Sequence, residues 1–264
     1  MESFRSYVSD PWADKGTDAL TSETLQQLVD NLIPYVRISD FATATACEGL
    51  SNSVVGLTFG AYRNVEPRID RIGCTVFEYS AIGKEEYFSA SKQAAEARDE
   101  LFLRTFDPLS MMMSLLSRNT GRRASIARNS LGQSYYAGLV RRIERGTLLH
   151  VDYAPAEQIG WEICDIRHQL SWNLYVKIDD SRSGQTTIYH RQWRPEDNRF
   201  KEGGYGFNPE VVVGSEHVTF QPAVGEAILF NTRNYHMVAP SCGGRITVTS
   251  AIGETPHGDL IFWS

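Results

Sequence analysis

The sequence predicts a mostly β fold with N-terminal helices, in which a jelly-roll core (a double-stranded β-helix, cupin-like) is flanked by helices. Apolar residues recur mainly at helical spacing up to residue 134. From 135 to 264, short alternating segments are separated by Gly, Pro, Asp or Asn. Eight or more short strands without intervening helices are typical of two antiparallel sheets around a pocket. We expect one domain, 1–264, in which the helix-rich segment 1–134 packs on the core 135–264.

The helices of the N-terminal segment are expected at 17–33, 42–50 and 85–117, and short strands are expected at 35–38 and 74–79. Thr17 and Asp18 precede a run of leucines at helical spacing, which is the usual start of an amphipathic helix. Within the long third helical stretch, Pro108 should split or kink the helix because it lacks the backbone donor that a helix interior needs.

The strands of the core are expected at 137–145, 147–152, 169–178, 185–191, 210–220, 226–231, 234–239, 245–252 and 259–263. The long connections 153–168 and 192–209 interrupt this series. Long loops in compact domains are often binding lids, although plain surface excursions are nearly as common, and the sequence does not decide which of the two would be a lid.

Composition excludes several classes of protein. The 264 residues are 42% apolar, which suits one substantial core. A net charge of −6 argues against a nucleic-acid partner. The four cysteines are widely spaced and suit reduced thiols rather than disulfides or a zinc site. No segment resembles a signal peptide or a membrane span. We expect a cytoplasmic protein, a monomer or homodimer, that acts on a small molecule.

The run 148–152 ends in His150 and Asp152, two residues apart. In an extended chain, residues i and i+2 point to the same face, so both side chains would enter one cavity. Two histidines and one carboxylate on one face of a metal are the ligand set of non-heme Fe(II) oxygenases. The pair therefore suggests an iron site that needs a second, distant histidine.

His236 is the best candidate for that second histidine. It follows the turn and apolar strand 225–231, whereas His168, His190 and His217 are interpreted as structural histidines and His257 lies beyond the core strands. Nine residues after His236, alternation places Arg245, Thr247 and Thr249 on one strand face. A buried guanidinium needs an anion, and a carboxylate is its natural bidentate partner.

The pattern His150-x-Asp152, His236, Arg245-x-Thr247 resembles the Fe(II)/2-oxoglutarate-dependent oxygenases. The resemblance implies that His150, Asp152 and His236 bind Fe(II). It further implies that 2-oxoglutarate, with O2 as the other co-substrate, is held at its far carboxylate by Arg245 and Thr247.

Several further segments resemble the branch that contains the aliphatic halogenases of hapalindole and welwitindolinone alkaloids. These segments are 168–172, 184–193, 225–231 and 261–264, so the similarity covers about half of the chain. In those halogenases a glycine replaces the acid and opens an iron position for chloride, whereas this chain retains Asp152. The resemblance therefore implies hydroxylation of an aliphatic C–H bond, with desaturation or cyclisation as the alternative. A non-catalytic jelly-roll binding module is the alternative from another class.

The sequence offers several candidate residues for a substrate pocket but does not single out one substrate class. Candidates for the substrate wall are Tyr135, Arg142, Tyr153, Trp161 and Trp172, each with ordinary core packing as the alternative. Between 118 and 145, seven arginines accompany one acid, Glu144. This cluster is either a solvated basic edge or an attractant for anionic substrates. An amino acid or derivative, a nucleotide and an alkaloid-type natural product all remain possible substrates.

Overall fold

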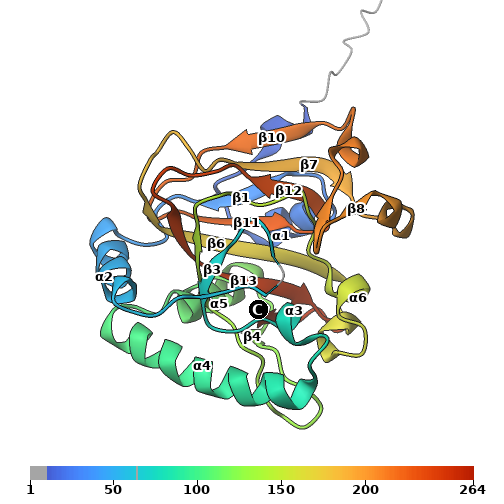
Figure 1. Ribbon diagram of the computed structural model, residues 1–264. Coiled ribbons are helices and arrows are strands. Elements are labelled where there is room, and N and C mark those ends of the chain that lie inside the picture. The colour runs from blue at the N-terminus through green and yellow to red at the C-terminus, as the bar shows by residue number, and fades with distance from the viewer. Residues whose placement is uncertain (1–10, 64) are drawn as a thin grey trace, which may run out of the picture.

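The computed structural model describes residues 11–63 and 65–264, and it consists of two stacked β-sheets with helices on the outer side of the larger one (Figure 1). The large sheet runs in the order β1-β11-β6-β13-β5-β3-β2, and β14 joins it between β13 and β4. Its strands are β1 (Tyr35–Ile38), β2 (Gly60–Ala61), β3 (Asp70–Ile72), β4 (Ala124–Ile126), β5 (Leu139–Ile143), β6 (His168–Ile178), β11 (Ala227–Asn231), β13 (Arg245–Glu254) and β14 (Leu260–Trp263). Strands from both halves of the chain therefore share one sheet.

The small sheet lies above the large one in Figure 1 and has the order β10-β7-β12. It consists of β10 (His217–Phe220), β7 (Thr186–Gln192) and β12 (Asn234–Val238), all antiparallel. Buried side chains from both sheets form one apolar cluster, among them Tyr175, Ile188, Phe220 and Ile228. Two antiparallel sheets packed face to face confirm the predicted jelly-roll core.

Helices cover the outer face of the large sheet and share its largest apolar core. The helices of this core are α1 (Ser22–Val29), α2 (Ala44–Val55), α4 (Lys84–Arg104) and α5 (Pro108–Thr120). The one-turn helices α3 (Val76–Tyr79) and α6 (Ala154–Glu157) lie instead beside a cavity on the other face of the sheet. Leu28 of α1, Leu50 of α2 and Met112 of α5 are fully buried in the same cluster as Trp172 of β6. Among the described residues, no helix combines the length and the apolar character that crossing a membrane requires.

The alternation of β6 separates two environments. Leu170, Trp172 and Leu174 belong to the apolar core under the helices, whereas Gln169 and Ser171 line a cavity on the opposite face of the sheet. Because successive side chains of a strand point to opposite faces, one strand supplies both the core and the cavity wall.

Helix boundaries follow local capping. The helix predicted at 17–33 begins only at Ser22, because the Thr21 hydroxyl accepts from the Thr24 amide and the Thr24 hydroxyl accepts from the Thr21 amide. Pro108 splits the third helical stretch as predicted, since it opens α5 directly after its N-cap, Asp107.

Three strand predictions are wrong. Residues 74–79 contain the one-turn helix α3, where Glu78 accepts from the Thr75 hydroxyl and pairs with Arg71 of β3. Residues 147–152 form a single bridge rather than a strand, because their other backbone groups bond to different segments. Residues 210–220 contain the 3-10 helix η4 (Pro209–Val212) and only then β10, after a turn at Gly214 with φ +77°.

Several short elements were not predicted, because two or three residues carry no readable period. They are β2, β3, β4, and the ribbon of β8 (Lys201–Glu202) and β9 (Gly206–Phe207) within the connection 192–209. The remaining 3-10 helices are η1 (Trp12–Lys15), η2 (Glu162–Asp165) and η3 (Pro195–Phe200). Both long connections are therefore built from short elements instead of free loop.

Candidate metal centre

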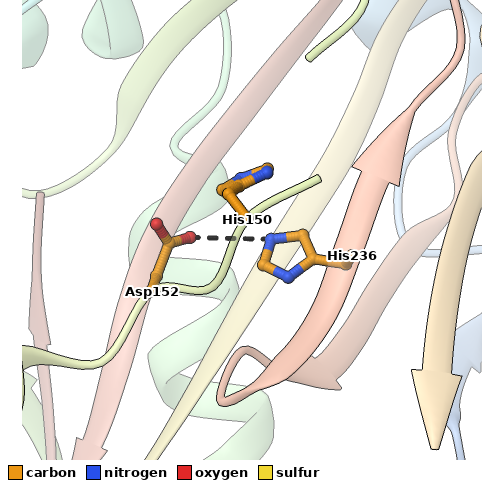
Figure 2. Close-up of side chains that lie close together, drawn as sticks. All are labelled: His150, Asp152 and His236. Atoms are coloured by element: carbon orange, nitrogen blue, oxygen red, sulfur yellow. Dashed lines mark ion pairs between the residues drawn. The ribbon is translucent and has the colours of Figure 1, made fainter. Parts of the chain in front are cut away.

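Three side chains from two distant segments meet between the sheets: His150, Asp152 and His236 (Figure 2). Their candidate ligand atoms all lie within 4.8 Å of one another. His236 Nε2 is 3.7 Å from Asp152 Oδ2, and the two imidazole rings have centroids 4.2 Å apart. Both histidines are buried, whereas the Asp152 side chain is 51% exposed.

Backbone hydrogen bonds hold the two segments in register. The His150 amide donates to the His236 carbonyl at 3.0 Å, and the His236 amide donates back at 2.9 Å. The Asp152 amide donates to the Thr232 carbonyl, and the Thr232 hydroxyl donates to the Asp152 carbonyl, both at 2.9 Å. The three side chains are therefore placed by the paired backbone of 150–152 and β12.

The two imidazoles are oriented in the same way. Nδ1 of His150 lies 2.8 Å from the Leu148 carbonyl, and Nδ1 of His236 lies 2.9 Å from the Asn234 carbonyl. Because a carbonyl can only accept, Nδ1 carries the hydrogen in both rings, so Nε2 is the nitrogen that offers a lone pair to a metal when the ring is neutral. Burial, followed by the charge of His150, lowers the pKa of His236 to about 3. The neutral ring is the form that binds a metal.

The ligand types favour a particular class of metal. Two imidazoles and one carboxylate match the facial triad of non-heme Fe(II) centres, which leaves the remaining coordination positions open. Carbonyl partners on the second nitrogen of each ring are the usual way to fix such ligands. This chain therefore presents a ligand set that fits Fe(II).

A second buried polar pair lies on β13. Arg245 Nη1 donates to the Gly184 carbonyl at 2.8 Å and to the Thr186 hydroxyl at 3.2 Å. Arg245 Nε and the Thr247 hydroxyl are buried without a hydrogen-bond partner among the described residues. Desolvation by burial lowers the pKa of Arg245. A carboxylate ligand would satisfy both free groups, so the pair fits the far end of 2-oxoglutarate.

A cavity of about 170 Å³ opens beside the metal cluster, and His150 and Asp152 lie on its wall. Its polar wall includes Arg141, Glu157 and Gln169, and its apolar wall includes side chains such as Ile69, Phe77 and Leu139. Burial, followed by repulsion from Asp152, raises the pKa of Glu157 to about 7. Glu157 nevertheless remains accessible to water, because it faces the open cavity.

The five residues expected on the substrate wall do not line this cavity; the described residues around it are others. Tyr135 and Trp161 belong to an aromatic cluster with Tyr87, and the Tyr135 hydroxyl donates to Glu162 at 2.7 Å. These positions correct the expectation for both residues, which serve core packing.

The other three expected wall residues also point elsewhere. Trp172 is fully buried under the helices, 6.1 Å from Phe41 between ring centroids. Tyr153 lies under the guanidinium of Arg233. Arg142 pairs with Asp70 on the outer side of β5. Strand alternation explains the Arg142 error, because the adjacent Arg141 takes the cavity side.

Sequence reasoning missed Arg141 and Glu157 for different reasons. In the pair Arg141-Arg142 the alternation could be read in either register, and only the pairing of β5 with β13 decides it. Glu157 ends the short helix α6 inside a connection predicted as loop, where no period was available. No local signal separates the two faces of β5, because Leu139 and Val140, two positions before Arg141 and Arg142, are both apolar.

Comparison with known proteins identifies relatives of this chain. The family described as carrier-protein-independent halogenase WelO5 matches residues 59–263. An L-γ-glutamyl-L-propargylglycine hydroxylase from Streptantibioticus cattleyicolor is 30% identical over 256 residues, covering 93% of this chain and 94% of the relative. Leucinostatins biosynthesis cluster protein S from Purpureocillium lilacinum is 34% identical over 216 residues, covering 76% of this chain and 87% of that one.

Solved structures share the fold at low sequence identity. An N-substituted L-amino acid dioxygenase from Burkholderia ambifaria superposes with a TM-score of 0.64 at 12% identity, covering 92% of this chain and 91% of the other. The α-ketoglutarate-dependent epimerase SnoN of nogalamycin biosynthesis gives a TM-score of 0.51 at 13% identity, with 89% and 87% covered. The chain therefore belongs to the WelO5 family of carrier-protein-independent halogenases and is an Fe(II)/2-oxoglutarate-dependent oxygenase.

Proposed function

We propose that His150, Asp152 and His236 bind Fe(II), that Arg245 and Thr247 bind the far carboxylate of 2-oxoglutarate, and that the enzyme hydroxylates an aliphatic C–H bond of a small amino-acid derivative. The observation that carries this proposal is the carboxylate of Asp152, held 3.7 Å from His236 Nε2. The hydroxylase from S. cattleyicolor, similar over nearly its whole length, supports the substrate class.

Bound Fe(II), 2-oxoglutarate and O2 together supply an oxidant that removes a hydrogen atom from an unactivated C–H bond, and 2-oxoglutarate leaves as succinate and CO2. The protein residues around the metal perform positioning. The Leu148 and Asn234 carbonyls orient the two imidazoles, and the buried Arg245 offers charge and hydrogen bonds to a dianionic co-substrate. The cavity wall holds the substrate and limits the access of water to the reacting bond.

Asp152 favours hydroxylation over halogenation. A halogenating centre needs an iron position that a halide can take, and here a carboxylate belongs to the three-ligand cluster at that position. If Asp152 binds the metal, its carboxylate would close that position to a halide. Hydroxylation is therefore the expected outcome, even though the family is described by its halogenases.

Free thiols support a reducing compartment for this chemistry. All four cysteines are unpaired, and Cys47 and Cys74 are buried as packing residues. Disulfides are rare in the cytosol, so we infer a cytoplasmic enzyme.

An anaerobic titration tests the proposed centre. Addition of Fe(II) and 2-oxoglutarate to the purified protein should produce the metal-to-cofactor charge-transfer absorption band. His236→Ala should abolish the band, and His217→Ala, which removes an exposed histidine on β10, should not. With substrate present, each turnover should form one succinate and one product that is heavier than the substrate by one oxygen atom. No absorption band with the wild-type protein would reject the proposed function.

A further inference from the structure

The cavity wall carries two charged side chains besides the candidate ligands: Arg141 on β5 and Glu157 at the end of α6. Neither has an oppositely charged partner within ion-pair distance among residues 11–63 and 65–264. The unpaired donor of the partly buried Arg141 costs free energy that an anionic ligand would recover, whereas the exposed Glu157 offers a hydrated carboxylate to a cation.

Arg141 has only neutral partners. Its Nη2 donates to Asn173 Oδ1 at 2.8 Å and weakly to the Thr249 hydroxyl at 3.4 Å. Its Nε is buried without a partner in the described chain. The next residue, Arg142, is already neutralised, because its Nε donates to Asp70 at 3.2 Å. Two adjacent arginines thus differ in their partners: Arg142 is paired with a carboxylate, whereas Arg141 faces the cavity with neutral partners only.

Glu157 is the complementary group. Its Oε2 accepts from the Tyr153 amide at 3.2 Å, which leaves most of its acceptor capacity unused. Glu157 therefore has oxygen lone pairs free for the donors of a cation. An ammonium group is the cation that offers several donors to a carboxylate.

The rest of the wall sets the shape of the ligand. Ile69, Phe77 and Leu139 are apolar, and the cavity of about 170 Å³ is slightly larger than the cavity of about 150 Å³ that accepts benzene in another protein. A short aliphatic chain fits this space, whereas a large polycyclic molecule would have to extend through the mouth. The cavity therefore combines an anion site, a cation site and room for aliphatic carbon.

From this combination we infer that the substrate is a zwitterionic amino acid or short peptide whose carboxylate binds Arg141 and whose ammonium binds Glu157. The inference rests on the proposed function, since the oxidised C–H bond must lie beside the metal cluster. Arg141 is available for the substrate because Arg245 and Thr247 serve the co-substrate. Arg141 and Glu157 would then determine specificity by charge.

Calorimetric titration of the anaerobic protein, loaded with Fe(II) and 2-oxoglutarate, tests this inference. The probes are the proteinogenic L-amino acids and their γ-glutamyl dipeptides, followed by the carboxamide and the N-acetyl derivative of the tightest binder. A hydrogen bond to a charged group predicts a loss of about 10- to 100-fold in affinity for each derivative. Arg141→Gln should weaken binding of the parent compound by a similar factor and leave binding of the carboxamide unchanged. Glu157→Gln should weaken binding of the parent compound by a similar factor and leave binding of the N-acetyl derivative unchanged.

Arg142→Gln is the matched control and should bind every probe as the wild type does. The inference is overturned if no zwitterion binds, if the charge-deleted derivatives bind as well as the parent, or if Arg141→Gln weakens 2-oxoglutarate instead of the amino acid. The wild-type comparison of derivatives decides the question even if a variant does not fold. Failure of the proposed function is distinguishable, because it removes the charge-transfer band before any amino acid is added.

Discussion

The two faces of the large sheet use the same strands for opposite purposes. On the face toward the helices, Trp172, Leu174 and Val248 are completely buried among apolar side chains. On the face toward the small sheet, Asn173 and Thr247 are equally buried but polar. The outer face supplies burial of apolar area, which is the main favourable term in folding. The inner face gives up some of that stabilisation to hold groups that need ligands.

This difference predicts how substitutions should behave. Changes on the inner face should alter ligand binding with little loss of stability, and changes on the outer face should do the reverse. Unpaired buried groups such as Arg245 Nε are costly in the ligand-free protein. Stability and function therefore separate by strand face instead of by sequence region.

The largest expected effect is that of His236→Ala. Removal of one imidazole from the three-ligand cluster should lower activity by more than about 100-fold, the upper limit for losing a residue that only orients a ligand. The free energy of unfolding should change by less than about 2 kcal/mol, because the lost side chain is polar and contributes little apolar burial. Succinate formation and urea unfolding measure the two quantities. A large loss of stability with retained succinate formation would contradict the division between the faces.

Asp152→Gly should be the next largest effect on chemistry. Loss of the carboxylate should reduce hydroxylation by at least about 100-fold and open a metal position to chloride or bromide. Mass spectrometry of products formed with each halide in turn checks this expectation. If product masses are the same with chloride, bromide and neither, Asp152 is not a metal ligand. Asp165→Gly, at an exposed position of η2, is the control and should leave hydroxylation unchanged.

The sequence predicted which side chains face inward where apolar residues alternate with polar ones along a strand and so mark its outer face. Ile246 and Val248 mark the outer face of β13, so Arg245 and Thr247 were predicted to face inward together, and the structure places them so. His150 and Asp152 were predicted on one face of a strand. The strand does not form, but the extended backbone that the bridge to His236 holds there still brings both side chains to the same side.

The cavity wall was not readable, because it depends on tertiary pairing. A shift of one residue in register exchanges Arg141 for Arg142, and the local sequence does not contain that information. The prediction that tryptophans line the substrate wall depended on tertiary packing in the same way. Trp172 and Trp161 suit a substrate wall by chemistry, yet a large apolar side chain gains more from complete burial in a core than from a half-open pocket.

Leu174→Ala tests the outer face. Leu174 is fully buried in the core shared with the helices, so its truncation should lower the free energy of unfolding by about 2–5 kcal/mol. Binding of 2-oxoglutarate per folded molecule should not change, because no atom of the inner face is removed. Urea unfolding and the charge-transfer titration at low temperature provide the comparison. If Leu174→Ala also weakened binding of 2-oxoglutarate per folded molecule, the two faces would be coupled and the prediction would fail.

The smallest expected effect is that of Thr247→Val, which should change stability and co-substrate binding in opposite directions. The buried Thr247 hydroxyl has no hydrogen-bond partner among the described residues, so Thr247→Val should raise the free energy of unfolding of the ligand-free protein by about 1 kcal/mol. The same variant should bind 2-oxoglutarate about 2- to 13-fold more weakly, the value of one neutral hydrogen bond.

Thr249→Val provides the opposite case two residues along the same face. The Thr249 hydroxyl already donates to the Trp172 carbonyl at 2.7 Å, so its removal should lower stability by about 1 kcal/mol. Urea unfolding of both ligand-free variants, followed by titration with 2-oxoglutarate, measures the contrast. Destabilisation by both substitutions would mean that Thr247 is satisfied within the folded chain, and its unpaired hydroxyl would then no longer argue for a carboxylate ligand beside Arg245.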